Sequence, residues 1–223
     1  MRMKHPREYK YILFDLDGTL TNPALGITNS VMYALKKFGI EVKVRADLYK
    51  FIGPPLTYSF KEYYGFTDEQ ALMALSYYRE RFSAGGLFEN EIYAGMAELL
   101  SELHGSGRHL ILATSKPEEF AVKILEHFSI LEYFTFVAGN TLNESRPEKR
   151  DVIGHIMKNI PSLTPDNAIM VGDRKYDVLG AAEFNLPCIG VLYGYGGREE
   201  LESAGAVQLA ESVDALKRIL LGE

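Results

Sequence analysis

Acidic side chains follow two apolar segments of this chain at a spacing that suits metal-assisted chemistry. The stretch YILFDLDGTLTN (residues 11–22) runs from apolar residues into Asp15 and Asp17. A later apolar segment ends at Asp173, and Asp177 follows it closely. Burying an unpaired charge is costly, and burying two like charges side by side is worse. A cation among these carboxylates would remove that cost, so the pattern predicts a metal site.

The four acids are suited to phosphoryl transfer. Mg²⁺ takes one or two carboxylates and keeps waters and substrate phosphate oxygens, so Asp15 and Asp173 could share one ion. With the metal present, the Asp15 carboxylate is a competent nucleophile that can form an aspartyl-phosphate. Asp17 lies two residues further along an extended chain, faces the same side, and could protonate the leaving group and later activate water. Asp177 could orient the loop or hold a metal-bound water.

Two hydroxyl groups lie at the end of another apolar segment, HLILAT (109–114). The Thr114 and Ser115 side chains could hydrogen-bond phosphoryl oxygens. Ser115 and Glu118 have the spacing of a capping box, which would direct a helix N-terminus toward the same anion. A helix cap is also the ordinary role of such a serine.

A lysine completes the predicted site. Lys149 begins a helical pattern, and its ammonium group suits the charge on Asp15 and on a transferring phosphoryl group. Arg146 and Arg150 lie close by and compete for this role. Each of these residues alone has an ordinary structural explanation, and only their joint placement indicates a catalytic site.

Alternating strand and helix patterns predict how these residues are positioned. Five apolar segments indicate buried strands, at 9–15, 109–114, 133–139, 167–173 and 187–194. Helical patterns cover 94–105, 116–128, 148–160, 174–184 and 212–221. This alternation predicts an α/β fold with a Rossmann-like parallel five-stranded sheet. Ligands of such sheets bind beyond the carboxyl ends of the strands, where the acids and hydroxyls fall.

The stretch between the first two strand segments is helical and reads as an inserted domain. Helices are expected to begin at Asn22-Pro23, to cover 45–51 and 56–64, and to continue after a capping box of Thr67 and Gln70. We therefore expect a discontinuous core domain of residues 1–20 and 87–223 and a helical cap domain of residues 21–86. Hinges are expected near Thr21 and at Gly85-Gly86.

Composition restricts the class of protein. The net charge of −6 and the lack of a basic run argue against nucleic-acid binding. No segment approaches the ~20 apolar residues of a membrane helix, and the basic start MRMKHPREYK lacks the apolar part of a signal peptide. The single cysteine, Cys188, excludes an internal disulfide and fits a reducing compartment. We expect a cytoplasmic monomer or weak homodimer with a small phosphorylated substrate and no nucleic-acid or membrane partner.

Three motifs resemble signatures of the haloacid dehalogenase-like hydrolase superfamily. They are DLDGTLT (15–21), ILATSKP (111–117) with Thr114 in the threonine or serine position, and VGDRKYD (171–177). The helical insert is similar to the C1-type cap of the phosphoglycolate phosphatase-like branch, and FIGPPL (51–56) to its cap loop. The third signature is often Lys-Pro, but here the segment reads ESRPEKRDVIG. Lys149 is assigned to it, with Arg146 as the rival.

The resemblance implies a magnesium-dependent phosphatase that acts through an aspartyl-phosphate. Its nucleophile would be Asp15 and its general acid and base Asp17, and the phosphoryl group would be bound by Thr114, Ser115 and Lys149. The metal would be held by Asp15, the backbone carbonyl of Asp17, Asp173 and Asp177, the last either directly or through water.

The substrate follows only by analogy with the family. Phosphoglycolate is the leading expectation, and a nucleotide or pyrophosphate is the alternative. In the insert, Arg45 and Lys50 are candidate partners for a second anionic group, and Tyr58 or Tyr64 could contact a base. A β-phosphoglucomutase-like phosphomutase and a noncatalytic binding protein are the competing functional classes.

Overall fold

The structure is a computed structural model that describes residues 9–222. This range forms two compact units, one made of residues up to Thr21 and from Ile92 onward, the other of Asn22–Glu91. Residues 1–8, which carry most of the basic start, lie outside the described residues. None of the helices within residues 9–222 is long and apolar enough to cross a membrane.

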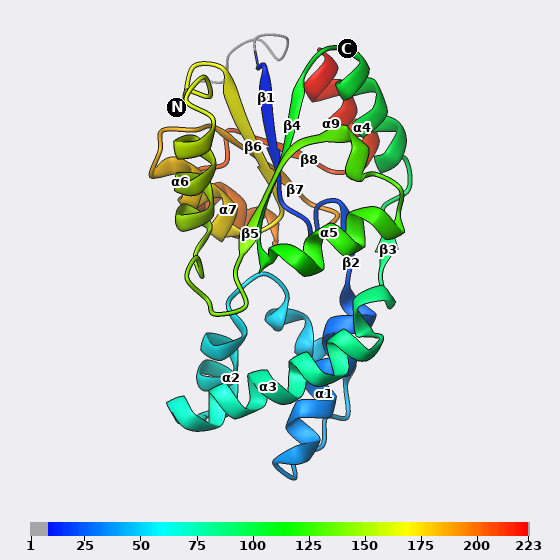
Figure 1. The fold of residues 1–223 in the computed structure, drawn as a ribbon, viewed down its shortest axis with the longest axis vertical. Coiled ribbons are helices and arrows are strands. Elements are labelled where there is room, and N and C mark those ends of the chain that lie inside the picture. The colour runs from blue at the N-terminus through cyan, green and yellow to red at the C-terminus, as the bar shows by residue number, and fades with distance from the viewer. Residues whose placement is uncertain (1–8, 223) are drawn as a thin grey trace. The chain divides into compact units, whose positions relative to one another are not determined.

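The larger unit is built on a six-stranded parallel sheet with the order β5-β4-β1-β6-β7-β8 (Figure 1). Its strands are β1 (Tyr11–Phe14), β4 (His109–Pro117), β5 (Phe134–Asn140), β6 (Ala168–Gly172), β7 (Cys188–Val191) and β8 (Gln208–Ala210). The predicted α/β class is confirmed, but the predicted count of five strands is wrong. The sixth strand, Gln208–Ala210, is three residues long and too short to give an apolar pattern.

Helices cover both faces of this sheet (Figure 1). They are α4 (Met96–Gly105), α5 (Glu118–His127), α6 (Lys149–Asn159), α7 (Lys175–Ala182), α8 (Arg198–Ala204) and α9 (Val213–Leu221). Figure 1 shows α6 and α7 on one side and α4 and α9 on the other. The sequence REELESA of α8 buries only Leu201, which explains why no helical pattern predicted this element.

Strand register sets the position of the functional residues. Leu13 of β1 pairs with Ile111 of β4 and Met170 of β6, and all three side chains belong to one buried core cluster. All residues of β1 and β6 are buried, so these strands are covered on both faces of the sheet. The same register brings the carboxyl ends of β1, β4 and β6 to one edge. The residues immediately beyond Phe14 and Gly172 therefore lie next to each other.

The smaller unit is helical. It contains α1 (Ala24–Lys37), a 3₁₀ helix at Arg45–Phe51, α2 (Leu56–Tyr64), α3 (Asp68–Ala84) and a 3₁₀ turn at Gly86–Phe88. The predicted capping box is present at the start of α3, where Thr67 Oγ1 accepts from Gln70 N and Gln70 Oε1 accepts from Thr67 N. Before α1, Asn22 Oδ1 accepts a hydrogen bond from Ala24 N at 3.2 Å, so Asn22 assists the helix start as its type suggests.

Gly85 and Gly86 lie inside the smaller unit, although the sequence suggested a hinge there. A Cβ atom on Gly26 of α1 would lie 2.0 Å from Gly86 O, so the two backbones are in direct contact. The chain instead passes between the units at β2 (Thr21–Asn22) and β3 (Glu91–Ile92), which pair as a two-stranded sheet. Gly86 is thus a packing residue of the helical unit.

This contact predicts a stability effect. Gly26→Ala should lower the free energy of unfolding by roughly 1–3 kcal/mol, because the new methyl group meets a backbone oxygen that cannot move aside alone. Gly105→Ala at the end of α4 is the control, since a Cβ atom there meets nothing within 4 Å. Thermal and urea unfolding of both variants provide the measurement. Equal stability of the two variants would contradict the close backbone contact.

Candidate active site

Three carboxylates from distant parts of the sequence meet at the carboxyl edge of the sheet. One oxygen each of Asp15, Asp173 and Asp177 lies within 4.8 Å of the other two. Asp15 and Asp173 directly follow β1 and β6, and Asp177 lies in the first turn of α7. Their exposed fractions are only 6%, 0% and 1%. The cluster is therefore held almost entirely away from bulk water.

Glycines surround this cluster because the acids leave no room for other side chains. A Cβ atom on Gly18 would lie 2.1 Å from Asp173 Oδ2, and one on Gly194 would lie 2.4 Å from Asp173 Cβ. A Cβ atom on Gly172 would lie 2.2 Å from Asp177 Cγ. Gly18 also has φ +87°, which L side chains rarely adopt. The turn after β1 thus needs glycine for both its conformation and its space.

Lys149 contacts two of the three acids. As the first residue of α6, it donates hydrogen bonds to Asp15 Oδ1 and to Ala113 O, both at 2.7 Å, and its Nζ lies 2.8 Å from Asp177 Oδ1. Burial works against the charged ammonium, but Asp15 and Asp177 outweigh it and raise the pKa of Lys149 above its ordinary value. Lys149 is therefore a fixed positive charge beside Asp15.

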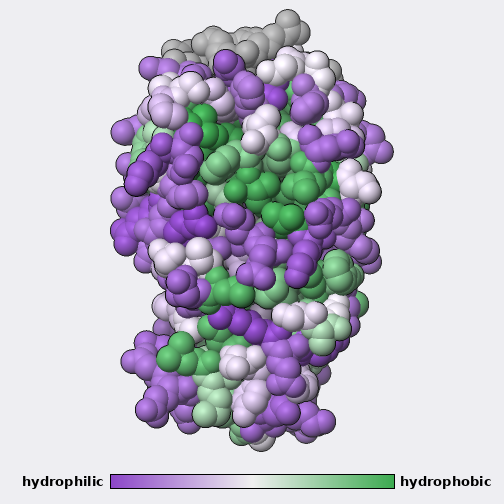
Figure 2. Space-filling model, viewed as in Figure 1, coloured by the Kyte–Doolittle hydropathy of each residue, from purple (hydrophilic) through white to green (hydrophobic). Residues whose placement is uncertain are grey.

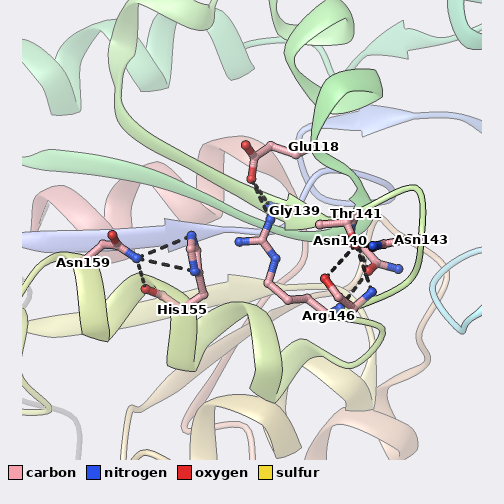
Figure 3. Close-up of polar contacts among 9 residues, drawn as sticks. Glu118, Gly139, Asn140, Thr141, Asn143, Arg146, His155 and Asn159 are labelled. Carbon is pink, nitrogen blue, oxygen red and sulfur yellow. Dashed lines mark hydrogen bonds and ion pairs between the residues drawn. The ribbon is translucent and has the colours of Figure 1, made fainter.

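The rival cation points elsewhere. The Arg146 guanidinium donates to Glu118 Oε2 at 3.2 Å, and Figure 3 shows it directed away from α6 toward Glu118. Arg150 pairs with Glu148 at 2.7 Å on the exposed side of α6. Of the three basic residues weighed from the sequence, the structure places Lys149 against Asp15.

A second buried lysine, which the sequence did not single out, contacts Asp17. Lys116 Nζ donates to Asp17 Oδ2 at 2.5 Å, and the Lys116 side chain is 5% exposed. Burial raises the pKa of Asp17, and the Lys116 charge opposes this shift. Asp17 Oδ1 is buried and has no hydrogen-bond partner among residues 9–222. The signal that could have found Lys116 is its position directly after the hydroxyl pair in ILATSKP.

The hydroxyl pair lies at the end of β4. Thr114 is buried, and its Oγ1 accepts a hydrogen bond from Lys116 N at 3.2 Å, while Ser115 is partly buried. The predicted capping box of Ser115 and Glu118 is wrong. β4 continues to Pro117, so Ser115 lies within the strand, and Glu118 accepts instead from Gly139 N at 3.3 Å (Figure 3).

The site carries more negative than positive charge. Four buried or nearly buried carboxylates face two buried ammonium groups, a formal charge of −2 when all six are ionised; they are Asp15, Asp17, Asp173 and Asp177 against Lys116 and Lys149. Burial raises the pKa of Asp173 well above its usual range, and the nearby Asp177 and Asp15 add to the shift. Burial likewise raises the pKa of Asp177 to about 6.

These features fit a divalent cation. Asp173 Oδ2 accepts from Tyr195 N at 2.7 Å, but its Oδ1 is buried and accepts no hydrogen bond from the described residues. A divalent ion would neutralise the charge excess and give this oxygen a partner. The Asp15, Asp173 and Asp177 carboxylates could hold it, and an all-oxygen donor set suits a hard metal ion.

Comparison with known proteins identifies the family. The model of the haloacid dehalogenase-like hydrolase family matches residues 12–191, so the chain belongs to this family, and the predicted membership and enzyme class are confirmed. A 5′-nucleotidase of Pseudomonas aeruginosa is 42% identical and aligns over 95% of this chain and 96% of its own. The tyrosine-protein kinase PtkA of Mycobacterium tuberculosis is 36% identical over 94% of this chain and 72% of its own.

A solved structure and a relative of lower sequence identity agree with this family assignment. The crystal structure of a predicted phosphatase from Clostridium acetobutylicum has a TM-score of 0.93 and 51% identity, covering 96% of this chain and 99% of its own. A phosphoglycolate phosphatase of Vibrio vulnificus is 29% identical and covers 96% of this chain and 97% of its own. The similarity therefore spans both compact units.

The crowded acids predict an unusual stability effect. In EDTA at pH 7.5, Asp173→Asn should be more stable than the wild-type protein, because it removes a buried negative charge and keeps an oxygen acceptor for Tyr195 N. The advantage should shrink as the pH falls toward 4, since the raised pKa lets the folded wild type protonate Asp173 before the unfolded chain does. Thermal unfolding across this pH range is the measurement.

Magnesium provides the second half of this test. It should raise the unfolding temperature of the wild type but not that of Asp173→Asn, because the variant lacks a ligand carboxylate. Glu119→Gln is the matched control, an exposed carboxylate on α5 that should change neither response. A variant that is less stable than wild type in EDTA would contradict the predicted charge excess, and one that Mg²⁺ stabilises as much as the wild type would contradict a metal site at Asp173.

Proposed function

We propose that this protein is a magnesium-dependent phosphomonoester hydrolase that forms a phosphoryl-aspartate on Asp15. The observation that carries the proposal is the buried arrangement of Asp15 with Lys149 and the acids Asp173 and Asp177. Membership of the haloacid dehalogenase-like hydrolase family supports it, as do the relatives named phosphatase and 5′-nucleotidase. When bound, Mg²⁺ would neutralise the carboxylates and polarise the phosphoryl group.

In the first step, a carboxylate oxygen of Asp15 attacks the phosphorus atom and the ester P–O bond breaks. Lys149 holds Asp15 Oδ1, which leaves Oδ2 to form the new bond. The departing oxygen takes a proton from the carboxyl group of Asp17. Lys149 stays charged throughout and stabilises the negative charge carried by the transferring group.

In the second step, water hydrolyses the phosphoryl-aspartate. Asp17 takes a proton from the water as its oxygen bonds to phosphorus, and the acyl phosphate bond breaks to release inorganic phosphate and regenerate Asp15. Thr114 and Ser115 would bind phosphoryl oxygens. Thr114 Oγ1 accepts from Lys116 N, so its own proton is available to donate to the substrate.

The substrate class that we infer first is a nucleoside 5′-monophosphate. The relative named 5′-nucleotidase is 42% identical over 95% of this chain, whereas the one named phosphoglycolate phosphatase is 29% identical over 96%. Phosphoglycolate, the leading expectation from the sequence, is therefore the second candidate.

The candidate substrate-binding residues of the helical unit differ in their contacts within that unit. Of the cations expected to meet a second anionic group, Arg45 already donates to Thr28 Oγ1 at 2.5 Å and to Asn29 Oδ1 at 2.8 Å. Lys50 lies over the Tyr63 ring at 4.4 Å. Tyr58, by contrast, is 49% exposed and free to contact an aromatic base.

A phosphate-release screen tests this proposal. Nucleoside 5′-monophosphates, phosphoglycolate, pyrophosphate and sugar phosphates are compared with and without Mg²⁺, and total phosphate ester is followed in parallel. Steady Mg²⁺-dependent release of inorganic phosphate supports a hydrolase. Conversion between esters that needs a bisphosphate primer would identify a phosphomutase. Absence of turnover for every ester would favour the alternative that the protein binds a ligand without catalysis.

The enzyme is placed in the cytoplasm as part of this proposal. The buried Cys188 forms no disulfide, which agrees with a reducing compartment.

Asp15→Asn should abolish phosphate release while the fold stays intact. The amide is a poor nucleophile, so kcat should fall by at least about 10³-fold for every ester tested. Steady-state kinetics with Mg²⁺ measures the loss, and circular dichroism checks folding. A variant that retains a tenth of wild-type turnover would rule out Asp15 as the nucleophile.

Asp17→Asn should impair the enzyme according to the leaving group. Alkyl phosphates need protonation of the departing oxygen, so their kcat should fall by roughly 10²–10⁴-fold. An aryl phosphate such as p-nitrophenyl phosphate, whose leaving group is stable as an anion, should lose much less in its first step. Burst kinetics separates the two steps for each ester. Equal loss of the first step for aryl and alkyl esters would exclude Asp17 as the acid.

A further inference from the structure

The ion pair between Lys116 and Asp17 has no part in the reaction as described above. Its two side chains are 5% and 13% exposed, and the Nζ–Oδ2 distance is 2.5 Å. Removing one partner of such a pair leaves an uncompensated buried charge, so the contact constrains both residues. Asp17 is also the residue whose carboxyl must be placed accurately against the leaving oxygen.

The backbone around Lys116 is held in place on two sides. Lys116 N donates to Thr114 Oγ1 at 3.2 Å. A Cβ atom on Gly139 would lie 2.6 Å from Lys116 O, so β5 packs directly against this peptide. Glu118 Oε2 accepts from both Gly139 N at 3.3 Å and the Arg146 guanidinium at 3.2 Å, which joins the start of α5 to the end of β5 (Figure 3). Lys116 therefore extends from a fixed base.

We infer that Lys116 is a positioning residue that holds Oδ2 of Asp17 and thereby presents Oδ1 to the leaving group. Asp17 Oδ1 is buried and has no hydrogen-bond partner among the described residues, so it is the oxygen left to exchange a proton with substrate. That proton passes from Oδ1 to the ester oxygen as the P–O bond breaks, and it is replaced from water in the second step. The inference rests on the acid and base role proposed for Asp17.

The competing role for Lys116 is direct binding of a phosphoryl oxygen. The two roles differ in their dependence on Asp17. A lysine that acts through Asp17 matters only while Asp17 can protonate the leaving group, and it matters most for esters that need this proton. A lysine that binds the phosphoryl group contributes to every ester and does so whether or not Asp17 is present.

A double-mutant cycle distinguishes these roles. The variants are Lys116→Met, Lys116→Arg, Asp17→Asn and the double variant Lys116→Met/Asp17→Asn. Lys123→Met, an exposed lysine on α5, is the matched control. Each is assayed with Mg²⁺ on p-nitrophenyl phosphate and on the alkyl phosphate that the wild type hydrolyses best, with kcat and KM determined separately and the first step followed by burst kinetics.

Lys116→Met should lower kcat for the alkyl ester by about 10–100-fold and slow the first step of the aryl ester by less than about threefold. It should cause no further loss in the Asp17→Asn background, and Lys116→Arg should restore part of the activity. Lys123→Met should behave as wild type. Equal losses for both esters, or the same loss with and without Asp17, would overturn the inference.

Two outcomes separate this inference from the proposals beneath it. If Asp17→Asn itself shows no leaving-group dependence, the proposed role of Asp17 fails, whatever Lys116 does. Lys116→Met alone could fail to fold because Asp17 loses its partner. In that case Lys116→Arg, which keeps the charge, and the double variant, which removes both charges, still test the positioning role. An arginine variant with wild-type kcat for the alkyl ester supports positioning by charge, and one that slows the first step equally for both esters contradicts it.

Discussion

The site depends on one electrostatic constraint, the confinement of like charges at the carboxyl edge of a parallel sheet. Strand register brings Asp15 and Asp173 together, and α7 adds Asp177. Such a cluster destabilises the folded protein unless cations offset it. The apolar cluster that contains Leu13 and Met170 provides hydrophobic stabilisation that keeps these strands in register against that repulsion.

Each of the two buried lysines bonds one carboxylate oxygen of one of the two acids that follow β1. Lys149 occupies one oxygen of Asp15, and Lys116 occupies one oxygen of Asp17. In each case the second oxygen is the one to which we assign the proposed chemistry, as nucleophile in Asp15 and as proton carrier in Asp17. No lysine contact is found for Asp173 among the described residues, and its Oδ1 is a buried oxygen without a hydrogen-bond partner there, which a metal ion could supply. Each of these three acids thus has its own cation, a lysine or the proposed metal ion, that suits the role proposed for it.

Much of this arrangement could be predicted, because a run of apolar residues in the sequence shows where a buried strand ends. Asp15 and Asp173 directly follow such strands and Thr114 lies near the end of β4, so their positions at one edge were predictable from the fold class. The direction in which each basic side chain points was not predictable. Spacing could not decide between Lys149, the first residue of α6, and Arg146 in the loop before it. Lys116 was overlooked because the strand was expected to end at residue 114, while β4 continues to Pro117.

The residues proposed for the chemistry all belong to one of the two units. Every residue given a catalytic role here lies in the larger unit, at positions fixed by strands and glycines. Relatives that are similar over nearly the whole chain nevertheless carry the names 5′-nucleotidase and phosphoglycolate phosphatase. A site this crowded tolerates few changes, since even a methyl group on Gly18 would strike Asp173. Exposed side chains of the helical unit, such as Tyr58, lie under no such packing constraint, so we propose that differences in substrate among these relatives arise there.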